Sequence, residues 1–182
     1  TTYDSTAFGA ARAQPPLAEH LSRPLPDILR PILESSQNWF ADMLLKTLGR
    51  EYRGSGSFAA GLDVERRFLI DSLRVDSTQF DVVDGSGLSS SDLVTPRAFV
   101  QLLRRMREHP RAQPFLEGLP VAGRSGTLRF RFRDTPLEGR VRAKTGSISR
   151  VNALAGYLEL DGGQTWTFSI QLNHHTGSTR DA

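Results

Sequence analysis

The chain has 182 residues, enough for one domain with a hydrophobic core, and it contains no cysteine. The absence of cysteine excludes a disulfide scaffold and a thiolate metal site, and no apolar run in the sequence is long enough for a transmembrane helix. Lysine and arginine number 23 against 20 acidic residues, and the net charge of +3 is too small to indicate a nucleic-acid partner.

The beginning of the chain is rich in alanine, proline and polar residues. Pro15-Pro16 and Pro24-Leu25-Pro26 favour extended or turn backbone, so this stretch is predicted to be a short strand or a linker. A helix is predicted to begin at Asp27, whose side chain can cap the first turn. Pro31 should kink or shorten this helix, which ends before the loop at Ser36.

Two further helices are expected in the first half of the chain. The first is amphipathic, opens at Ser36-Gln37-Asn38 and stops at Gly49. Its predicted core face comprises Trp39, Phe40, Met43, Leu44, Thr47 and Leu48. The second follows the loop Gly54-Ser55-Gly56 and spans Ser57 to Leu73. Its predicted inward residues are Phe58, Leu62, Phe68, Leu69 and Leu73.

The middle of the chain contains a turn signal and a helix-start signal. Phe80 to Val83 is predicted to be a short strand that leads into Asp84-Gly85-Ser86-Gly87, whose residues favour a tight turn with positive φ. Thr95 as N-cap and Pro96 at the first helical position then begin another helix. Its predicted buried residues are Phe99, Val100, Leu102, Leu103 and Met106, and its solvated ones are Arg104, Arg105 and Arg107.

The last third of the chain is predicted to form a sheet. Thr127 to Arg133 alternates apolar and cationic residues, with the period of a half-buried strand. Three more strands are predicted at Val141–Lys144, Asn152–Leu160 and Thr165–Leu172. Asp161-Gly162-Gly163 is the expected hairpin turn between the last two.

One lysine stands out, because arginine is the usual cation of this chain and only Lys46 and Lys144 are lysines. Lys144 lies in Gly139-Arg140-Val141-Arg142-Ala143-Lys144-Thr145-Gly146-Ser147, a predicted strand that ends in Lys-Thr-Gly-Ser. A compact ammonium with an adjustable pKa differs chemically from a guanidinium that is always charged. The Lys-Thr-Gly motif therefore indicates a chemical role, although an ordinary cation at a strand end has the same local sequence.

Ser36-Gln37-Asn38 is a Ser-x-Asn motif, which is known to occur together with Lys-Thr-Gly. By itself Ser-x-Asn carries little information, since both residues are common N-caps. Together with Lys-Thr-Gly, however, it is typical of enzymes that recognise penicillin. Two competing assignments fail on spacing: Ala143 and Glu138 stand where a P-loop needs glycine, and no serine has the flanking glycines of a hydrolase elbow.

The chain resembles the serine D-Ala-D-Ala carboxypeptidases and endopeptidases of the class C low-molecular-mass penicillin-binding proteins, peptidase family S13. Three sequence blocks carry the resemblance, and they have the order and spacing that the family shows. The resemblance covers roughly Leu25 to Leu172. These blocks are Ser36-Gln37-Asn38 with its helix, Asp84-Gly85-Ser86-Gly87-Leu88-Ser89 followed by Thr95-Pro96-Arg97, and Gly139 to Ser147.

The resemblance implies an α/β (α+β) fold of the penicillin-binding and β-lactamase-like transpeptidase type, in which helices flank an antiparallel sheet. The family also makes a short helix as good an expectation as a strand for residues 127–133, so both remain open. The Ser-x-x-Lys motif of the family is missing, because Met43 and Val141 stand three residues before the two lysines. We therefore expect residues 1–182 to be the C-terminal part of one such domain, incomplete in this chain and without the segment that carries the nucleophile.

The resemblance also implies the catalytic roles. Ser36 would relay a proton towards the leaving nitrogen, and Asn38 would bind the amide carbonyl of the substrate. Lys144 would hold Ser36 and supply positive potential for the terminal carboxylate of the substrate.

The same strand would bind the ligand. The hydroxyls of Thr145 and Ser147 would bind the carboxylate, and Gly146 would keep the strand edge open. The Ser147 N–H would be half of an oxyanion hole. The loop with Asp84, Ser86 and Gly87 would border the cleft, although locally it is equally a plain surface turn. No metal or cofactor is expected, since His174 and His175 are adjacent and would point to opposite faces of a strand.

The implied whole enzyme is a serine-type D-alanyl-D-alanine carboxypeptidase or endopeptidase that acts on peptidoglycan stem peptides through an acyl-enzyme. Its partners would be stem peptides ending in D-Ala-D-Ala, β-lactams and the missing N-terminal segment, with no nucleic acid. It would be periplasmic or extracytoplasmic, with peripheral contact to the inner membrane as an option.

Two alternative functions remain: a non-catalytic remnant that still recognises ligand, and an Arg-rich module for an anionic polymer. The arginines of that module would be Arg129, Arg131, Arg133, Arg140 and Arg142, interleaved with Phe130 and Phe132.

Overall fold

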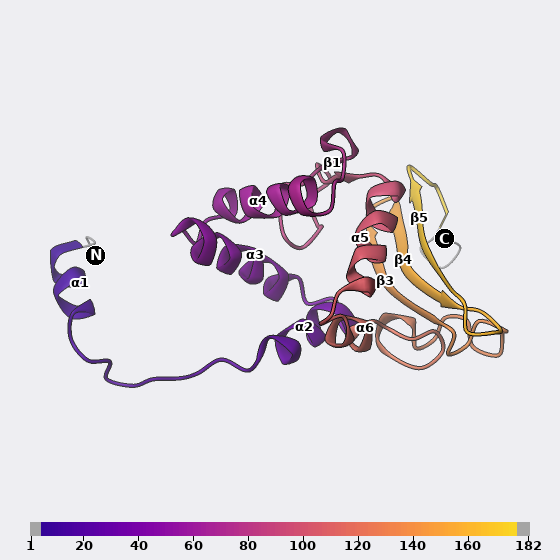
Figure 1. Cartoon of the computed structure of the whole chain (residues 1–182), viewed down its shortest axis with the longest axis horizontal. Coiled ribbons are helices and arrows are strands. Elements are labelled where there is room, and N and C mark those ends of the chain that lie inside the picture. Colours follow the sequence, from indigo (N-terminus) through magenta and orange to yellow (C-terminus); the bar gives the residue numbers. More distant parts are fainter. Residues whose placement is uncertain (1–4, 178–182) are drawn as a thin grey trace.

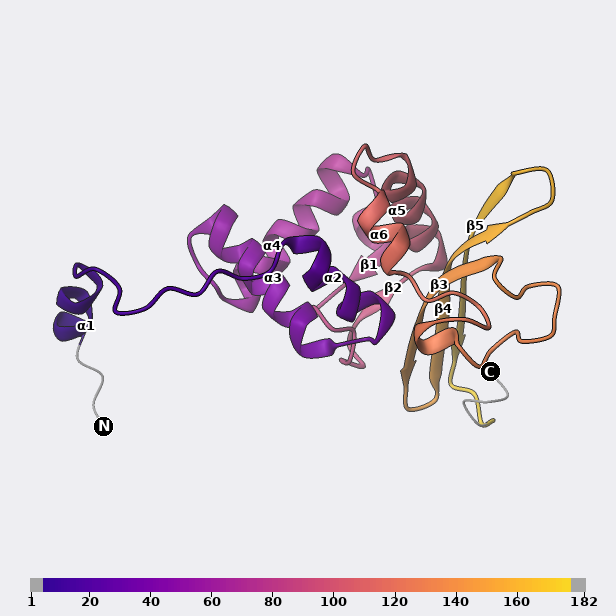
Figure 2. The same ribbon diagram turned by 90° about the horizontal axis from the view of Figure 1, so that it is seen from below.

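A computed structural model describes residues 5–177, with helices in the first two thirds of the chain and an antiparallel sheet in the last third (Figure 1). Helix α1 (Ser5–Arg12) lies apart from the rest, at the end of an extended segment (Figures 1 and 2). The prediction of a strand or linker here was wrong for α1 and right for the extended residues after it. In the described part of the chain, no helix is long and apolar enough to cross a membrane.

Helix α2 (Leu25–Glu34) begins two residues earlier than predicted, because Pro26 fits the first turn, where no backbone donor is needed. Pro31 lies inside α2. Helix α3 (Asn38–Arg53) begins at the predicted residue but continues past Gly49, which was wrongly predicted to end it. Gly54, with φ 72°, is the left-handed residue that caps α3.

Gly49 is needed for packing rather than for helix termination. Helix α4 (Phe58–Arg67) lies beside α3, and the two helices meet through Leu45, Gly49 and Gly61, which are all buried. A Cβ on Gly49 would lie 2.7 Å from the Gly61 nitrogen. The backbones therefore approach too closely for any larger side chain.

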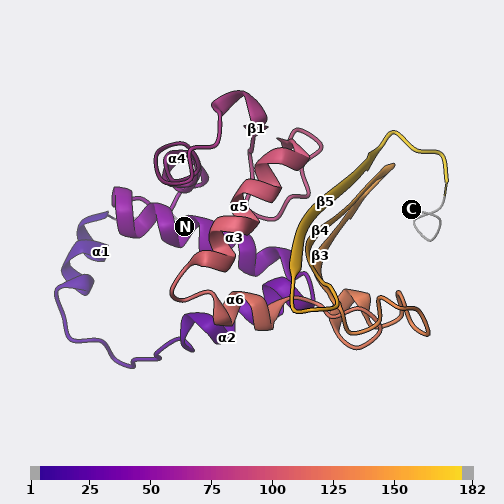
Figure 3. The ribbon, with the colours of Figure 1, turned by 45° about the vertical axis from the view of Figure 1, so that its right-hand side comes forward.

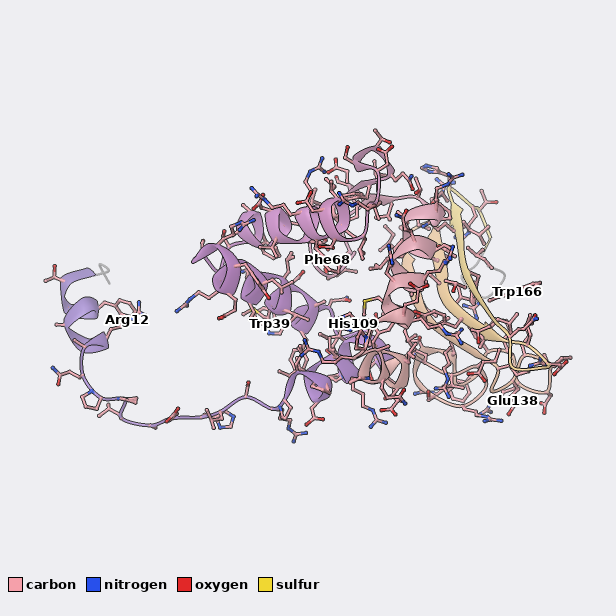
Figure 4. All side chains as sticks on the ribbon, viewed as in Figure 1. Arg12, Trp39, Phe68, His109, Glu138 and Trp166 are labelled. Carbon is pink, nitrogen blue, oxygen red and sulfur yellow. The ribbon has the colours of Figure 1, made fainter. Side chains whose placement is uncertain are left out.

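The predicted core face of α3 was accordingly wrong for Trp39, Phe40, Met43 and Thr47, which are exposed, whereas Leu44 and Leu48 are half-buried. Phe40 and Met43 are 44% and 42% exposed, and Trp39, which was assigned to the core, is 70% exposed at the end of α3 (Figure 4). Of the residues predicted to face inward in the range Ser57 to Leu73, Leu73 is buried, whereas Phe58 and Phe68 are 37% and 45% exposed. The contact with α4 uses the side of α3 that carries Leu45 and Gly49, so Trp39, Phe40 and Met43 are left facing outward.

After α4 the chain passes through a π-helical turn (Phe68–Ser72) and a 3₁₀ turn (Ser77–Gln79) into the short strands β1 (Phe80–Asp81) and β2 (Leu93–Val94), which pair antiparallel. Helix α5 (Pro96–Glu108) begins as predicted, with the Thr95 hydroxyl accepting a hydrogen bond from the Ala98 N–H. A short helix that was not predicted, α6 (Gln113–Gly118), packs against α2.

The main sheet has the order β3 (Val141–Ile148), β4 (Val151–Glu159) and β5 (Thr165–Asn173), all antiparallel and close to the predicted ranges. The predicted hairpin turn between β4 and β5 is confirmed, with Gly162 and Gly163 both at positive φ. The strand predicted at Val141–Lys144 continues to Ile148, so the Lys-Thr-Gly-Ser motif lies towards the C-terminal end of β3, as predicted for Gly139 to Ser147.

Helix α5 covers one face of this sheet (Figure 3), where the Tyr157 hydroxyl donates to the Leu103 carbonyl at 2.7 Å. The other face is covered at one end by residues 121–140, which pack Ala122 and Leu128 against Val141 and Ala143. Residues 127–133 form neither of the two predicted elements, because Gly126–Leu128 is a 3₁₀ turn and irregular turns follow it.

We expect Gly49→Ala to destabilise the fold by about 1–3 kcal/mol, because the new methyl group would meet backbone atoms that cannot move aside. Urea denaturation would measure the loss. Gly56→Ala is the matched control, since a Cβ there has only the Lys46 carbonyl oxygen nearby, at 3.9 Å. Equal stability of the two variants would contradict the close helix contact.

Candidate active site

Lys144 lies on the face of β3 that is turned towards the helices. Alternate residues of a strand point to opposite faces, so Lys144 shares its face with Tyr157 and Ala155 of β4, which pack near α5 and α2. Thr145 and Ser147 are on the other face, which also carries the buried Val141 and Ala143. The lysine therefore extends into the space where the turn between α2 and α3 arrives.

Ser36 lies in that turn, with φ 56°, in the left-handed region that non-glycine residues seldom adopt. The N–H groups of Ser35 and Gln37 both donate to the Pro31 carbonyl, at 3.3 and 3.1 Å, and so hold the turn against the end of α2. A left-handed conformation costs about 1–2 kcal/mol for an L-residue. The fold accepts this strain at one of the predicted catalytic positions.

The Lys144 ammonium joins the two motifs. Its Nζ donates to Ser36 Oγ at 2.8 Å and to the Thr145 carbonyl at 2.6 Å. Ser36 and Lys144 are 108 positions apart in the sequence, so only the tertiary fold brings them together. Burial lowers the pKa of Lys144 below its ordinary value, because desolvation disfavours the charged form.

The edge of β3 is covered along only part of its length. The Ala122 N–H donates to the Val141 carbonyl, and the Ala143 N–H donates to the Pro120 carbonyl. These bonds identify the odd-numbered residues as those whose backbone groups face away from β4. Within residues 5–177 no strand pairs with this edge from Lys144 to Ile148, so the N–H of Ser147 faces an open edge.

Gly146 does not need to be glycine for the sake of the chain itself. A Cβ at this position would make only an ordinary 3.5 Å contact with Ala153, and its φ is not positive. Neither packing nor backbone conformation explains the glycine. That it allows a ligand to approach the strand closely stays a prediction.

Thr127 is a residue that the sequence analysis did not single out. Thr145 Oγ1 donates to Thr127 Oγ1 at 2.8 Å, and Thr127 lies in the 3₁₀ turn that packs against the C-terminal end of α2. A Cβ on Gly126 would come within 3.0 Å of Glu34 Cγ. Nothing in the local sequence marks Thr127, because the contact depends on the packing of three distant segments.

Asn38 is the first residue of α3, two positions after Ser36, and is half-buried. Its side-chain amide makes no hydrogen bond to any other residue in the described part of the chain. The Lys144 ammonium therefore contacts both Ser36 Oγ and the Thr145 carbonyl, and Asn38 lies two residues after Ser36 with its amide unengaged.

The predicted cleft loop packs against α3. The Gly85 N–H donates to Asp42 Oδ1 at 3.0 Å, and Asp42 is one helical turn beyond Asn38. Asp84 organises the loop, since its carboxylate accepts hydrogen bonds from the N–H groups of Ser86, Gly87 and Ser89. Gly87 has φ 74°, as the turn prediction required. In residues 5–177 no hydrogen bond joins this loop to Lys144.

Two further carboxyl groups, those of Glu65 and Asp92, lie close enough to Asp84 to interact with its charge. Burial, together with the nearby charges of Asp92 and Asp84, raises the pKa of Glu65 above its ordinary 4.5. Burial also raises the pKa of Asp92, whose Oδ1 accepts a hydrogen bond from the Val83 N–H. Burial alone would raise the pKa of Asp84 as well, but the hydrogen bonds from Gly87 and Ser89 outweigh it and the pKa is lowered. Asp84 is thus the carboxylate that the loop keeps charged.

Comparison with known proteins supports the resemblance. The model of the D-Ala-D-Ala carboxypeptidase 3 (S13) family matches residues 5–182. A D-alanyl-D-alanine carboxypeptidase from an Actinomadura species is 43% identical over 166 residues, which are 88% of this chain and 30% of that protein. The carboxypeptidase DacB of Haemophilus influenzae is 33% identical over 88% of this chain and 34% of its own length. The chain thus spans about a third of the length of these relatives.

Solved structures agree with the fold. Penicillin binding protein 4 (dacB) of Haemophilus influenzae, complexed with a β-lactam, superimposes with a TM-score of 0.79 and 31% identity over 90% of this chain and 38% of that one. A predatory endopeptidase of Bdellovibrio bacteriovorus, in complex with an immunity protein, gives a TM-score of 0.66 and 26% identity over 82% and 37%. The expected α+β architecture of the penicillin-binding type is confirmed.

We expect Glu65→Gln to raise the melting temperature at neutral pH. Because the pKa of Glu65 is raised in the folded state, its contribution to stability is present at low pH and is lost as the pH rises through that pKa. The gain should shrink towards pH 4, where glutamate is protonated in both states. Thermal melts from pH 4 to 8 would measure it, with the exposed Glu51→Gln as control. A lower melting temperature for Glu65→Gln at pH 8 would contradict the assignment.

Proposed function

Because this chain belongs to the D-Ala-D-Ala carboxypeptidase 3 (S13) family, we propose that it forms one side of the active-site cleft of a serine-type D-alanyl-D-alanine carboxypeptidase or endopeptidase. The substrate is a peptidoglycan stem peptide that ends in, or is cross-linked through, D-Ala. β-Lactams bind the same cleft as substrate mimics. Residues 1–182 are the C-terminal part of the domain, and the nucleophilic serine comes from chain outside this sequence.

The observation that carries the proposal is the 2.8 Å hydrogen bond from Lys144 Nζ to Ser36 Oγ. Either motif by itself has an ordinary structural explanation, as an N-cap or as a strand cation. A half-buried lysine that donates to a serine in a strained turn has no such explanation. Desolvating an ammonium group costs free energy, and partly buried ammonium groups are typical of functional sites, where their charge binds substrate or takes part in the reaction.

The reaction begins when the hydroxyl of the external serine attacks the carbonyl carbon of the penultimate D-Ala. The C–N bond to the terminal residue breaks, and the proton from the serine passes by way of the Ser36 hydroxyl to the leaving amine. Water then attacks the acyl-ester, which releases the shortened peptide and restores the serine. In this scheme Ser36 is the proton carrier and Lys144 orients its hydroxyl.

The open edge of β3 provides the remaining functions. A peptide added along this edge would lie as an extra strand, oriented by main-chain hydrogen bonds. The Ser147 N–H then donates to the oxyanion, an interaction that is typically worth about 2.7–4 kcal/mol in the transition state. The hydroxyls of Thr145 and Ser147, with the ammonium of Lys144, bind the terminal carboxylate, and Asn38 binds the amide carbonyl of the substrate.

The cleft loop and the compartment complete the proposal. The Asp84, Ser86 and Gly87 loop borders the cleft beyond Asn38, since Asp42 fixes it one helical turn away. The enzyme works in the periplasm or another extracytoplasmic space, where peptidoglycan is found, including the outer surface of the inner membrane.

We expect penicillin to acylate the complete enzyme on a serine outside this sequence, which intact mass spectrometry and peptide mapping would locate. Lys144→Gln should slow acylation about 10- to 100-fold, since a hydrogen bond to a charged group is worth about 1.5–3 kcal/mol. Acylation of the wild type should also slow as the pH rises through the lowered pKa of Lys144.

Lys46→Gln is the matched control, because Lys46 is the other lysine of the chain and lies over the Phe58 ring in the contact between α3 and α4. An unchanged rate for Lys144→Gln would overturn the assignment of Lys144. Reversible binding of penicillin without any adduct would favour the non-catalytic alternative.

A further inference from the structure

The segment Arg124–Arg133, here called the arginine loop, contains four arginines and no acidic residue. It lies between α6 and β3, on the side of the sheet opposite α5, and the following Glu138 marks this region in Figure 4. The local sequence of residues 127–133 is compatible with either a strand or a short helix, and the proposed catalytic scheme does not use the cations of this segment. Its four positive charges without a negative one contrast with the whole chain, in which 23 basic and 20 acidic residues nearly balance.

Phe130 and its neighbours give the arginine loop a defined geometry. Phe130 is 68% exposed, and the guanidinium carbons of Arg129 and Arg133 lie 4.6 and 4.9 Å from the centre of its ring. Arg133 Nε also donates to the Arg129 carbonyl at 2.9 Å. Arg131 lies 5.4 Å from the centre of the Phe132 ring. These contacts hold long side chains in place and so reduce the entropy that binding an anion would cost.

The charges of Arg129, Arg131 and Arg133 are not neutralised. Within residues 5–177 none of the three lies within ion-pair distance of a carboxylate. Nearby Arg140 and Arg142 do have such partners, in Asp161 and Glu159. The three loop arginines are all exposed, so an external anion can reach them.

The arginine loop is rigidly connected to the proposed active site. Leu128 is fully buried against the sheet, and Thr127 accepts the hydrogen bond from Thr145, next to Lys144. An anionic chain held on the loop would therefore lie at a fixed distance from the open edge of β3. We propose that the arginine loop is a docking surface for polymeric peptidoglycan, which it binds through the carboxylates of stem peptides beside the one being cleaved; this inference rests on the proposed function.

The structure favours this partner over other anionic polymers. Two guanidinium groups lie against the Phe130 ring, which leaves little of its face for a stacked nucleobase. A lipid surface would need several inserted apolar side chains, and Phe130 is the only large apolar residue that the described loop exposes. Carboxylates suit the planar fork of arginine, which binds them through two hydrogen bonds.

The test compares two triple variants of the complete enzyme. One replaces Arg129, Arg131 and Arg133 with glutamine; the control replaces Arg50, Arg104 and Arg111, three exposed arginines outside the loop. Binding to purified insoluble peptidoglycan is measured by co-sedimentation at low and high salt. Since exposed ion pairs are worth about 0.2–1 kcal/mol each, the loop variant should bind about 3- to 100-fold more weakly, and the difference should narrow at high salt. The control should bind within about twofold of the wild type.

A second readout is the ratio of kcat/KM for polymeric peptidoglycan to kcat/KM for a soluble peptide ending in D-Ala-D-Ala. This ratio should fall in the loop variant, whereas general damage to the fold would lower both values together, and thermal melts check folding directly. Unchanged co-sedimentation, or an equal loss in the control, would overturn the proposal. So would tighter binding of the wild type to phosphatidylglycerol vesicles or to double-stranded DNA than to peptidoglycan. If penicillin forms no adduct the proposed function fails, but co-sedimentation still tests the arginine loop separately.

Discussion

The hydrogen bond between Lys144 and Ser36 is the interaction on which the arrangement of this molecule depends. It connects the Lys-Thr-Gly motif on the edge strand β3 to the turn between α2 and α3, and the two residues are 108 positions apart in the sequence. Both partners are in energetically unfavourable states. Ser36 has a left-handed backbone conformation, and the charge of Lys144 is partly desolvated. Residues in such states persist only where the surrounding structure imposes them, and here they are found at the site of the proposed chemistry.

The surrounding elements can be understood as supports for this contact. Bonds to the Pro31 carbonyl hold the Ser36 turn, and the backbone of Gly126 fits closely against the end of α2. The turn at Thr127 then reaches Thr145 from the opposite side of β3. Three segments that are distant in sequence thus meet at the strand edge, and the short segment at residues 120–122 leaves the rest of that edge free for a peptide.

Charge is distributed unevenly around the site. Arginine supplies nearly all the cations, and most of those with a described partner lie at the surface in exposed ion pairs. Lysine is used where a smaller, tunable cation touches Ser36, and the carboxyl groups whose pKa is raised by burial, Glu65 and Asp92, are half-buried near Asp84. The arginine loop forms a third environment, with organised but unneutralised charge. In the proposed complex with peptidoglycan both kinds of cation have a role, because Lys144 would contact the reacting end of the substrate and the loop arginines its remaining carboxylates.

Several features of this protein were determined by the sequence itself, because they depend on local chemistry. The Thr95-Pro96 helix start, the Gly162-Gly163 hairpin, the three strands and the two motifs of the site could all be predicted. Helix α1, the short helix α6, the path of residues 127–133 and the core face of α3 could not. Gly49 illustrates the reason: local rules make it a helix end, but its role is to let α4 approach, which depends on where Gly61 lies in space. The contact between Lys144 and Ser36 was implied by the family resemblance and is confirmed. The tertiary structure alone decided that Thr127 meets Thr145 beside this pair, because no local propensity specifies a contact between residues so far apart in the chain.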